Sequence, residues 1–261
     1  MREYANVPVN ISIVGSGNVA THLALAFHAA GCTIHQVLSR SLEHAQLLAR
    51  RVNAFPVNNW QRLDNEADIY LLAVSDDALY DLALDLRLPD ALVVHTSGST
   101  PLSVLKPISH RHGVLWSPQT FLRDIAMDYS RLPLCIEGST PKAEEELGEL
   151  AALVSRHIYR LGYEQRRHAH LAAVMVSNFV NALNATAHDY MQSHGLDPAM
   201  LHPLAEQTLA KWDYGNLWLQ QTGPAARRDS KTLDAQRRLL AESPELLKLY
   251  DEMTNLIQVH T

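Results

Sequence analysis

Cysteine is scarce in this sequence, and basic residues do not predominate. The 261 residues include two cysteines, Cys32 and Cys135, which are too few for a disulfide framework and stand in no metal-binding or redox spacing. Lys and Arg number 22 against 28 Asp and Glu, for a formal net charge of -6, so the composition gives no indication of a nucleic-acid partner. Apolar stretches of membrane-spanning length and the apolar run of a secretory signal are also lacking. We therefore expect a cytoplasmic protein that binds neither nucleic acid nor a membrane.

Metal-ligand patterns and hydrolase motifs are missing as well. Histidine is plentiful, at 14 residues, but the close pairs His110 with His112 and His168 with His170 are two positions apart and would face different ways on a helix. No serine stands in the elbow sequence that nucleophilic hydrolases use. The sequence thus favours neither a metal site nor a serine hydrolase.

A turn containing two glycines follows the first apolar run of the chain. It consists of Gly15, Ser16, Gly17, Asn18, Val19 and Ala20, and we call it the glycine turn. Gly15 would allow a tight turn, Gly17 would let the backbone approach a pyrophosphate, and Ala20 would keep a helix close to its strand. The alternative is a purely structural strand-to-helix turn. In its context the motif predicts a dinucleotide whose phosphates lie at a helix N-terminus.

Short apolar runs alternate with Ala- and Leu-rich segments as far as residue 161. This alternation is typical of a sheet with helices on both faces, whereas the remaining sequence is helical in pattern. The predicted strands are 9–14, 33–38, 68–74, 91–95, 113–116, 132–136 and 157–161, and the later helices are 166–194, 201–212, 233–241 and 244–259. We therefore expect an α/β protein, with a doubly wound Rossmann domain over residues 1–161 and an all-α domain over residues 162–261.

The residues after the second predicted strand bear on which cofactor is bound. NAD-binding folds usually place an acidic residue on the ribose about 20 residues after the glycines. Here these positions hold Ser39, Arg40 and Ser41, and a guanidinium between two hydroxyls suits a 2′-phosphate. The alternative is an exposed arginine beside a serine that caps a helix. The sequence favours NADP over NAD.

Two further strand ends point to the same crevice, because ligands of open α/β sheets bind beyond the carboxyl ends of the strands. The first would lie along the nicotinamide ribose and the diphosphate, and the second combines hydroxyls with a titratable histidine. A histidine at a strand end is at least as often a structural, hydrogen-bonded residue. The expected cofactor contacts are Ala73, Val74 and Ser75 at the first end, and His95, Thr96 and Ser97 at the second.

Candidate catalytic residues lie on the long predicted helix. His170, Val174 and Asn178 are spaced by four residues and share one face. His170 is the candidate acid or base, with His168 as its rival, because imidazole titrates near neutral pH. A buried Asn178 amide needs a hydrogen-bond partner. A substrate, the nicotinamide amide or a neighbouring helix could supply it.

The loop over residues 222–229 concentrates charge between two predicted helices. Arg227 and Asp229 in this loop could bind an anionic substrate. An ordinary helix connection with a surface ion pair would have the same composition. Both interpretations stay open at the level of sequence.

Taken together, these motifs resemble the bacterial Rossmann-like proteins that carry a C-terminal helical domain of uncharacterised function. The matching segments are 15–20, 39–41, 95–99, 118–121, 136–138, 170–178 and 222–229. Members are usually labelled NADP-dependent oxidoreductases, and their fold is similar to that of pyrroline-5-carboxylate reductase and of the 6-phosphogluconate and β-hydroxyacid dehydrogenase group. The resemblance implies NADP as cofactor, a small-molecule substrate with Gln119 among its binding residues, and a homodimer formed through the helical domains.

One position departs from the dehydrogenase pattern. β-Hydroxyacid dehydrogenases carry a lysine four residues before an asparagine on this helix, and here Val174 stands at the lysine position while Asn178 remains. We expect His170 to supply the proton instead, with Asn178 orienting the substrate. The leading interpretation is an NADP-dependent reductase of a carbonyl or imine on a small polar substrate, bound in a cleft between the domains. Its rivals are a non-catalytic NADP-binding sensor or scaffold, and a reductase with a deazaflavin coenzyme as hydride partner.

Overall fold

The computed structural model describes residues 9–123 and 125–261. These residues fall into two compact units, of which the first ends at Ala182 and the second runs from Leu183 to Thr261. The last strand ends at Arg160, next to the domain boundary that the sequence predicts. The first unit therefore also holds the opening turns of the helical region.

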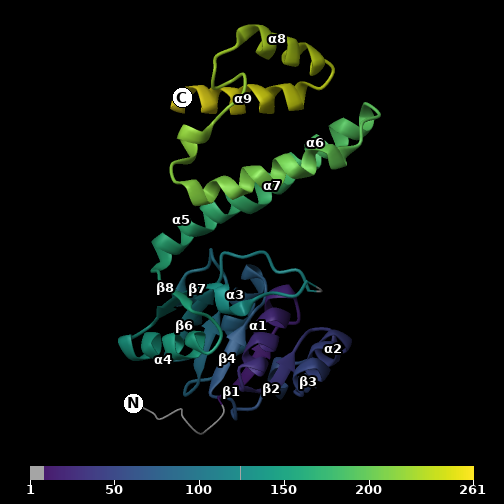
Figure 1. The fold of residues 1–261 in the computed structure, drawn as a ribbon. Helices are drawn as coiled ribbons and strands as arrows, with labels where there is room; N and C mark the ends of the chain where they lie inside the picture. Colours follow the sequence, from purple (N-terminus) through teal and green to yellow (C-terminus); the bar gives the residue numbers. More distant parts are fainter. Residues whose placement is uncertain (1–8, 124) are drawn as a thin grey trace. The chain divides into compact units, whose positions relative to one another are not determined.

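The first unit is built on an eight-stranded sheet in the order β3-β2-β1-β4-β5-β6-β7-β8 (Figure 1). The strands are β1 (Asn10–Val14), β2 (Thr33–Leu38), β3 (Phe55–Val57), β4 (Ile69–Leu72), β5 (Leu92–His95), β6 (Arg111–Trp116), β7 (Pro133–Gly138) and β8 (His157–Arg160). Neighbouring strands are parallel except for β6 and β7, which are antiparallel. The chain leaves β1 toward one edge and returns to β4 on the other side of β1, so the carboxyl ends of β1 and β4 form a switch point of the kind that binds ligands. The predicted α/β class is confirmed.

Apolar side chains pack on both faces of the sheet, because successive strand residues point to opposite faces. Leu71 belongs to a buried cluster with Leu23 and Leu147, whereas the next residue, Leu72, packs in a second cluster with Leu79. Burial on both faces explains why these strands read as continuous apolar runs. The helices of this unit are α1 (Asn18–Ala29), α2 (Leu42–Val52), α3 (Asp76–Asp85), α4 (Pro141–Ala152) and α5 (Tyr163–Val174).

A π-helical turn interrupts the long helix that the sequence predicts. α5 continues into this turn, Met175–Phe179, and then into α6 (Val180–Ser193). A π-turn closes its hydrogen bonds over one more residue than an α-turn. Residues beyond it are therefore rotated by about 100° relative to an uninterrupted α-helix.

The second unit is helical, as predicted. It contains α7 (His202–Ala210), α8 (Ser230–Leu239) and α9 (Pro244–His260). α8 and α9 lie side by side (Figure 1), and Arg237 Nε of α8 donates to the Asp251 carboxylate of α9 at 2.8 Å. Throughout the described ranges, the helices are too short or too polar to cross a membrane.

Candidate cofactor and active site

Gly15 occupies a backbone position that glycine alone fills without strain. Its φ of 121° lies in a region that L side chains rarely adopt. An added Cβ would stand 2.9 Å from the Ala73 carbonyl carbon, closer still to its oxygen, and 3.5 Å from Val74 Cγ1. The Gly15 N–H donates to the Leu38 carbonyl at 2.7 Å. The turn is therefore held against the carboxyl ends of both β2 and β4.

The N-terminus of α1 is open. Gly17 is its N-cap and makes no side-chain hydrogen bond, and the first turn carries no acidic residue. A Cβ at Gly17 would meet nothing within 4 Å, and Gly17 and Asn18 are both exposed. Unpaired N–H groups at the positive end of a helix dipole suit a phosphate. These residues therefore fit the pyrophosphate of a dinucleotide.

The end of β2 is joined to the glycine turn. The Ser16 hydroxyl donates to the Ser39 hydroxyl at 2.8 Å. Ser41 caps α2, because its side chain accepts from the His44 N–H at 3.3 Å. Arg40 is exposed, and its guanidinium makes no hydrogen bond or ion pair with any other described residue. The helix-cap interpretation thus holds for Ser41, while Arg40 is available to an anion.

The loop between β6 and β7 folds over the glycine turn, which the sequence did not lead us to expect. Asn18 Nδ2 donates to the Phe121 carbonyl at 2.9 Å. The Arg123 guanidinium donates to the Ser16 carbonyl, also at 2.9 Å. In the sequence, the only signal for this contact was an arginine, Arg123, a short distance after a central strand. Arg123 brings a second exposed cation to the turn.

A hydroxyl network at Asp76 ties the ends of β4 and β5 together. The Ser99 hydroxyl donates to the Asp76 carboxylate, and the Ser97 hydroxyl donates to Thr100 Oγ1 at 3.0 Å. Burial opposes the charge of Asp76, but hydrogen bonds from Ser99, Ser97 and Thr100 outweigh it and lower the pKa of this carboxyl. Ser75 precedes Asp76 as the N-cap of α3, with no side-chain cap hydrogen bond. The network fixes both strand ends beside the switch point.

His95 is buried at the end of β5. Its side chain is 0% exposed, and its Nδ1 accepts from the Ser97 N–H at 3.1 Å. Burial and, next in size, the charge of Arg166 lower the pKa of His95 to about 3, against the opposing effect of Asp76. The imidazole is therefore neutral. This placement favours the structural interpretation of the His95 side chain.

His170 reaches the carboxyl end of the sheet. Its ring makes an edge contact with Trp116, the last residue of β6, at a centroid distance of 5.8 Å. Its Cδ2 lies 3.1 Å from the position that a Cβ of Gly98 would take. One turn earlier on α5, the guanidinium of Arg166 is 1% exposed and pairs with Glu137 of β7. These contacts hold α5 against β6 and β7 and place His170 beside the loop that follows β5.

Asn178 lies in the π-turn, and its side chain is exposed. The Asn178 amide is therefore not buried, and its role in orienting a substrate stays a prediction. Ser177 is the residue of this turn that reaches back to the sheet, because its hydroxyl lies 2.9 Å from that of Thr120. His168 is also exposed and contacts no described residue through a hydrogen bond, ion pair or ring. Of the two candidate histidines, His170 is the one placed at the strand ends.

A small cavity of about 110 Å³ opens between α1 and the ends of β5 and β6. Its lining includes Val19, Thr96, Trp116, Ser117 and Gln119. The buried hydroxyl of Ser117 has no hydrogen-bond partner among the described residues. Two predicted cofactor contacts, Val19 and Thr96, therefore share a cavity with the predicted substrate residue Gln119.

Arg227 and Asp229 belong to the second unit. Asp229 caps α8, because its carboxylate accepts from the Thr232 N–H at 3.2 Å and from the Thr232 hydroxyl at 2.7 Å; these hydrogen bonds lower its pKa. Arg228, at a φ of 54°, donates to the Gln258 carbonyl near the end of α9 at 2.7 Å. The Asp229 carboxylate thus serves as a helix cap, which favours the interpretation of the loop as an ordinary helix connection, and the role of Asp229 in binding substrate stays a prediction. Arg227 is exposed and has no hydrogen bond or ion pair within the described ranges.

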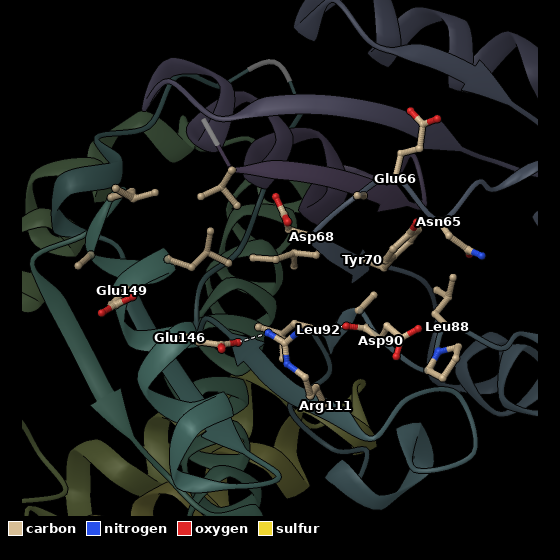
Figure 2. A pocket seen from close by; sticks show the side chains of 18 residues that line it. Asn65, Glu66, Asp68, Tyr70, Leu88, Asp90, Leu92, Arg111, Glu146 and Glu149 are labelled. Atoms are coloured by element: carbon tan, nitrogen blue, oxygen red, sulfur yellow. Dashed lines mark hydrogen bonds and ion pairs between the residues drawn. The ribbon is translucent and has the colours of Figure 1, made fainter. Parts of the chain in front are cut away.

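A much larger cavity, about 680 Å³, lies at the amino ends of the strands (Figure 2). The starts of β4, β5 and β6 line it, together with α4. Its charged residues are mostly carboxylates: Glu66, Asp68, Asp90, Glu146 and Glu149, with Arg111 as the cation. Dinucleotides bind at the opposite, carboxyl ends of the strands. This cavity therefore does not fit the phosphates of a nucleotide.

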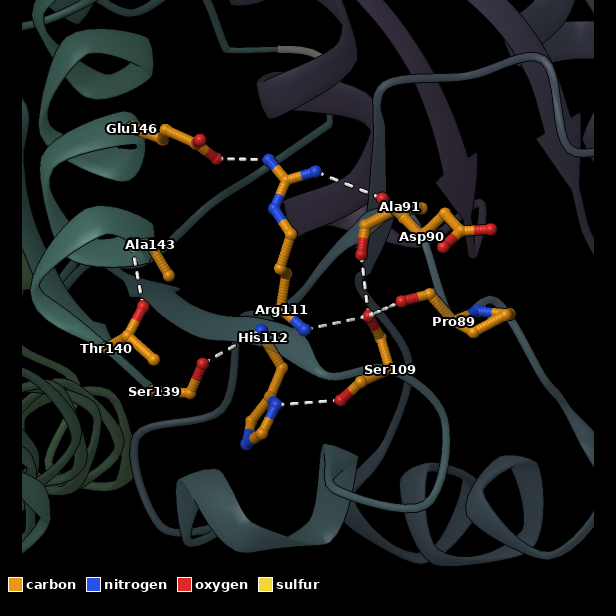
Figure 3. A network of polar contacts seen from close by, with 10 residues as sticks. All are labelled: Pro89, Asp90, Ala91, Ser109, Arg111, His112, Ser139, Thr140, Ala143 and Glu146. Carbon is orange, nitrogen blue, oxygen red and sulfur yellow. Dashed lines mark hydrogen bonds and ion pairs between the residues drawn. The ribbon is translucent and has the colours of Figure 1, made fainter.

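Polar contacts close one side of this cavity (Figure 3). The Arg111 guanidinium pairs with Glu146 of α4 and donates to the Asp90 carbonyl at 3.0 Å. The Ser109 hydroxyl donates to the Ala91 carbonyl at 2.6 Å and accepts from the Arg111 N–H at 3.0 Å. The Arg111 guanidinium thus joins the α3–β5 connection to α4, which gives the network a structural role.

Solved structures with a similar fold are described as oxidoreductases. The chain is 32% identical to a protein from Bacteroides fragilis described as a "putative NADP oxidoreductase", with a TM-score of 0.89 over 96% of this chain and 98% of that one. A reductive aminase from Aspergillus terreus, in complex with NADPH and ethyl-5-oxohexanoate, is 16% identical, with a TM-score of 0.72 over 97% and 93%. A pyrroline-5-carboxylate reductase from Coxiella burnetii is 15% identical, with a TM-score of 0.58 over 97% of each chain. The last two likenesses concern the fold alone.

Family models match the chain in two segments. A Rossmann-like domain matches residues 3–117, and a domain of unknown function, DUF2520, matches residues 132–257. No curated protein matches the chain significantly. The resemblance that the motifs predicted is confirmed, and the chain belongs to the family of proteins that join a Rossmann-like domain to a DUF2520 domain.

Proposed function

We propose that the chain is an NADP-dependent oxidoreductase that reduces a carbonyl or imine of a small polar substrate. The observation that carries this proposal is the open N-terminus of α1 at the glycine turn, with Arg40 exposed at the end of the adjoining strand. The description of the Bacteroides fragilis protein as an NADP oxidoreductase supports it. When bound, NADPH would supply a hydride to the carbon atom of the substrate.

The residues of the chain would divide the remaining work. The glycine turn would donate backbone N–H groups to the pyrophosphate, and Arg40 would grip the 2′-phosphate. His170 would hold a proton on its imidazole and give it to the substrate's oxygen or nitrogen as the hydride adds to carbon. Gln119, in the small cavity next to Trp116, and the exposed amide of Asn178 would hold polar groups of the substrate.

Nucleotide titration tests the cofactor. NADPH and NADH are titrated into the protein while nicotinamide fluorescence is followed. We expect the Kd for NADPH to be the lower one, and Arg40→Gln to raise it at least about tenfold while NADH binding stays unchanged, because a charge-assisted hydrogen bond is worth about 1.5–3 kcal/mol. If the protein binds neither NADPH nor NADH, the proposal is refuted.

Turnover tests the role of His170. Keto acids and cyclic imines are screened for loss of nicotinamide absorbance. His170→Ala should reduce kcat by about 10²- to 10⁴-fold, the usual contribution of general acid catalysis, without changing the Kd for NADPH. His168→Ala is the matched control, since it removes an exposed histidine from the same helix. Equal losses in the two variants would contradict the assignment of the proton to His170.

Val174 at the lysine position of the dehydrogenases favours a second candidate, a non-catalytic NADP-binding sensor. The two functions give different results in the same assays. A sensor would bind NADPH and turn over no carbonyl or imine in the screen. Its affinity for NADPH would stay the same when His170 is replaced by Ala.

We further propose that two copies associate through their helical regions, as the resemblance implies. Large apolar side chains of this region are about half exposed or more: Leu171 53%, Met175 51%, Phe179 54%, Leu204 60% and Trp212 58%. Extended apolar exposure of this kind marks interaction surfaces. Light scattering should give twice the mass of the chain, and Phe179→Glu should give monomers. A monomeric wild-type protein would exclude the dimer.

The cytoplasmic location stays a prediction.

A further inference from the structure

The glycine turn offers hydrogen-bond donors but no full positive charge. The first turn of α1, residues 18–21, contains no basic side chain. The Asn18 amide is already engaged, since it donates to the Phe121 carbonyl at 2.9 Å. Arg40 stands at the end of β2, where we place the 2′-phosphate. A doubly charged pyrophosphate at the turn therefore lacks a cation unless another segment brings one.

Arg123 stands at this turn. Its Nη2 donates to the carbonyl of Ser16, the residue before the N-cap of α1, at 2.9 Å. Arg123 is exposed, and its remaining N–H groups make no hydrogen bond or ion pair with the rest of the described chain. A guanidinium carries five N–H donors in a planar fork that matches two oxygens of a phosphate. The contact with Ser16 leaves most of these donors for a ligand.

The two residues before Arg123 fix its position. Phe121 is 7% exposed, and its carbonyl accepts from Asn18. The Leu122 carbonyl lies 2.9 Å from Nε2 of His22, a histidine of α1 that is 2% exposed. A carbonyl can only accept, so Nε2 carries the proton and donates. The loop is thus tied to α1 immediately before Arg123, and little conformational entropy would be lost when a ligand binds.

We propose that Arg123 binds the pyrophosphate of the dinucleotide, as a phosphate-binding residue that the β6–β7 loop adds to the glycine turn. This inference rests on the proposed function. Arg123 and Arg40 then act on different parts of the cofactor. Pyrophosphate is common to NADP and NAD, whereas the 2′-phosphate is not. Loss of Arg123 must therefore weaken the binding of both dinucleotides by the same factor, whereas loss of Arg40 must weaken the binding of NADP alone.

The test compares three ligands on the full chain: NADPH, NADH and adenosine 2′-monophosphate, which has no pyrophosphate. Arg123→Gln should raise the Kd of both dinucleotides by the same factor, about tenfold to a hundredfold, and leave that of adenosine 2′-monophosphate unchanged. Arg123→Lys keeps the charge and should recover part of the loss. Arg131→Gln is the matched control, because it removes an equal charge from another exposed position of the same loop and should change none of the three constants.

The wild-type titration separates the two ways in which the idea can fail. If the wild type binds neither dinucleotide, the proposed function falls and the role of Arg123 falls with it. If the wild type binds NADPH while Arg123→Gln changes its Kd less than twofold, or weakens NADPH alone, the role of Arg123 is overturned and the proposed function stands. Equal thermal unfolding midpoints of wild type and Arg123→Gln confirm that binding, and not folding, has changed.

Discussion

The two glycines of the glycine turn should respond differently to replacement by alanine: Gly15→Ala should mainly lower the stability of the fold, and Gly17→Ala should mainly weaken nucleotide binding. In Gly15→Ala, a φ of 121° costs an L residue about 1–3 kcal/mol. The new Cβ also collides with the carbonyl of Ala73. That carbonyl cannot retreat without straining the hydrogen bond from the Ala73 N–H to Val14, which is 2.8 Å long and worth about 1 kcal/mol. The sum is a loss of about 2–4 kcal/mol in the free energy of unfolding.

Gly17→Ala lacks both penalties. Its φ of -75° is ordinary, and the added Cβ meets nothing within 4 Å. Alanine is a poorer N-cap than glycine, so we expect a loss of at most about 1 kcal/mol. The methyl group would nevertheless stand where a pyrophosphate approaches the backbone, and NADPH binding should weaken at least about tenfold.

Thermal unfolding followed by circular dichroism measures the difference. At about 2–4 °C per kcal/mol for a unit of this size, Gly15→Ala should lower Tm by about 4–16 °C and Gly17→Ala by at most about 4 °C. Equal Tm losses in the two variants, or a loss below about 2 °C in Gly15→Ala, would refute the steric reasoning.

Three further predictions concern buried and capping groups. In the unfolded chain His95 binds a proton below its ordinary pKa near 6.5, whereas in the folded protein its pKa is about 3. The free energy of unfolding should therefore fall by about 1.4 kcal/mol per pH unit as the pH decreases from about 6.5 to about 3. In urea unfolding measured at a series of pH values, His95→Gln should flatten this part of the curve. Glu137→Gln leaves the buried Arg166 guanidinium without its anion and should cost about 3–5 kcal/mol in denaturant unfolding, against a smaller loss in Arg166→Met, which leaves only the more exposed Glu137 carboxylate unpaired; equal losses would contradict the ion-pair argument. Asp229→Ala removes the cap of α8 and should cost about 1 kcal/mol without changing the Kd for NADPH, whereas a change in that Kd would return Asp229 to the binding site.

The order of strands and helices was largely predictable, because burial on both faces leaves apolar runs that the sequence displays directly. β3 was missed, since Phe55–Val57 is a three-residue strand that contains a proline. The antiparallel direction of β7 was also missed. Its signal was the stretch between β6 and β7, whose described residues form no α-helix, whereas a parallel pair needs a crossover connection that is usually helical.

The candidate site was predictable where backbone geometry demands a particular residue, as at Gly15. It was not predictable where the environment decides the role of a side chain. His95 looked titratable, and only packing shows that it is buried and neutral. Asp229 looked available, although a helix start engages its carboxylate. Arg123 owes its place at the glycine turn to the hydrogen bonds of Phe121 and Leu122 with α1, and no local pattern encodes such long-range contacts.

The open N-terminus of α1 has a practical consequence for work in solution. Its unpaired N–H groups, beside the guanidinium of Arg123, would hold inorganic phosphate or sulfate as readily as they would hold the phosphate of a larger ligand. Such buffer ions would compete with NADPH and raise its apparent Kd in proportion to their concentration. They would also stabilise the folded protein by mass action. Phosphate buffer would thus make the protein more resistant to heat and, in the same measurement, a weaker binder of its nucleotide.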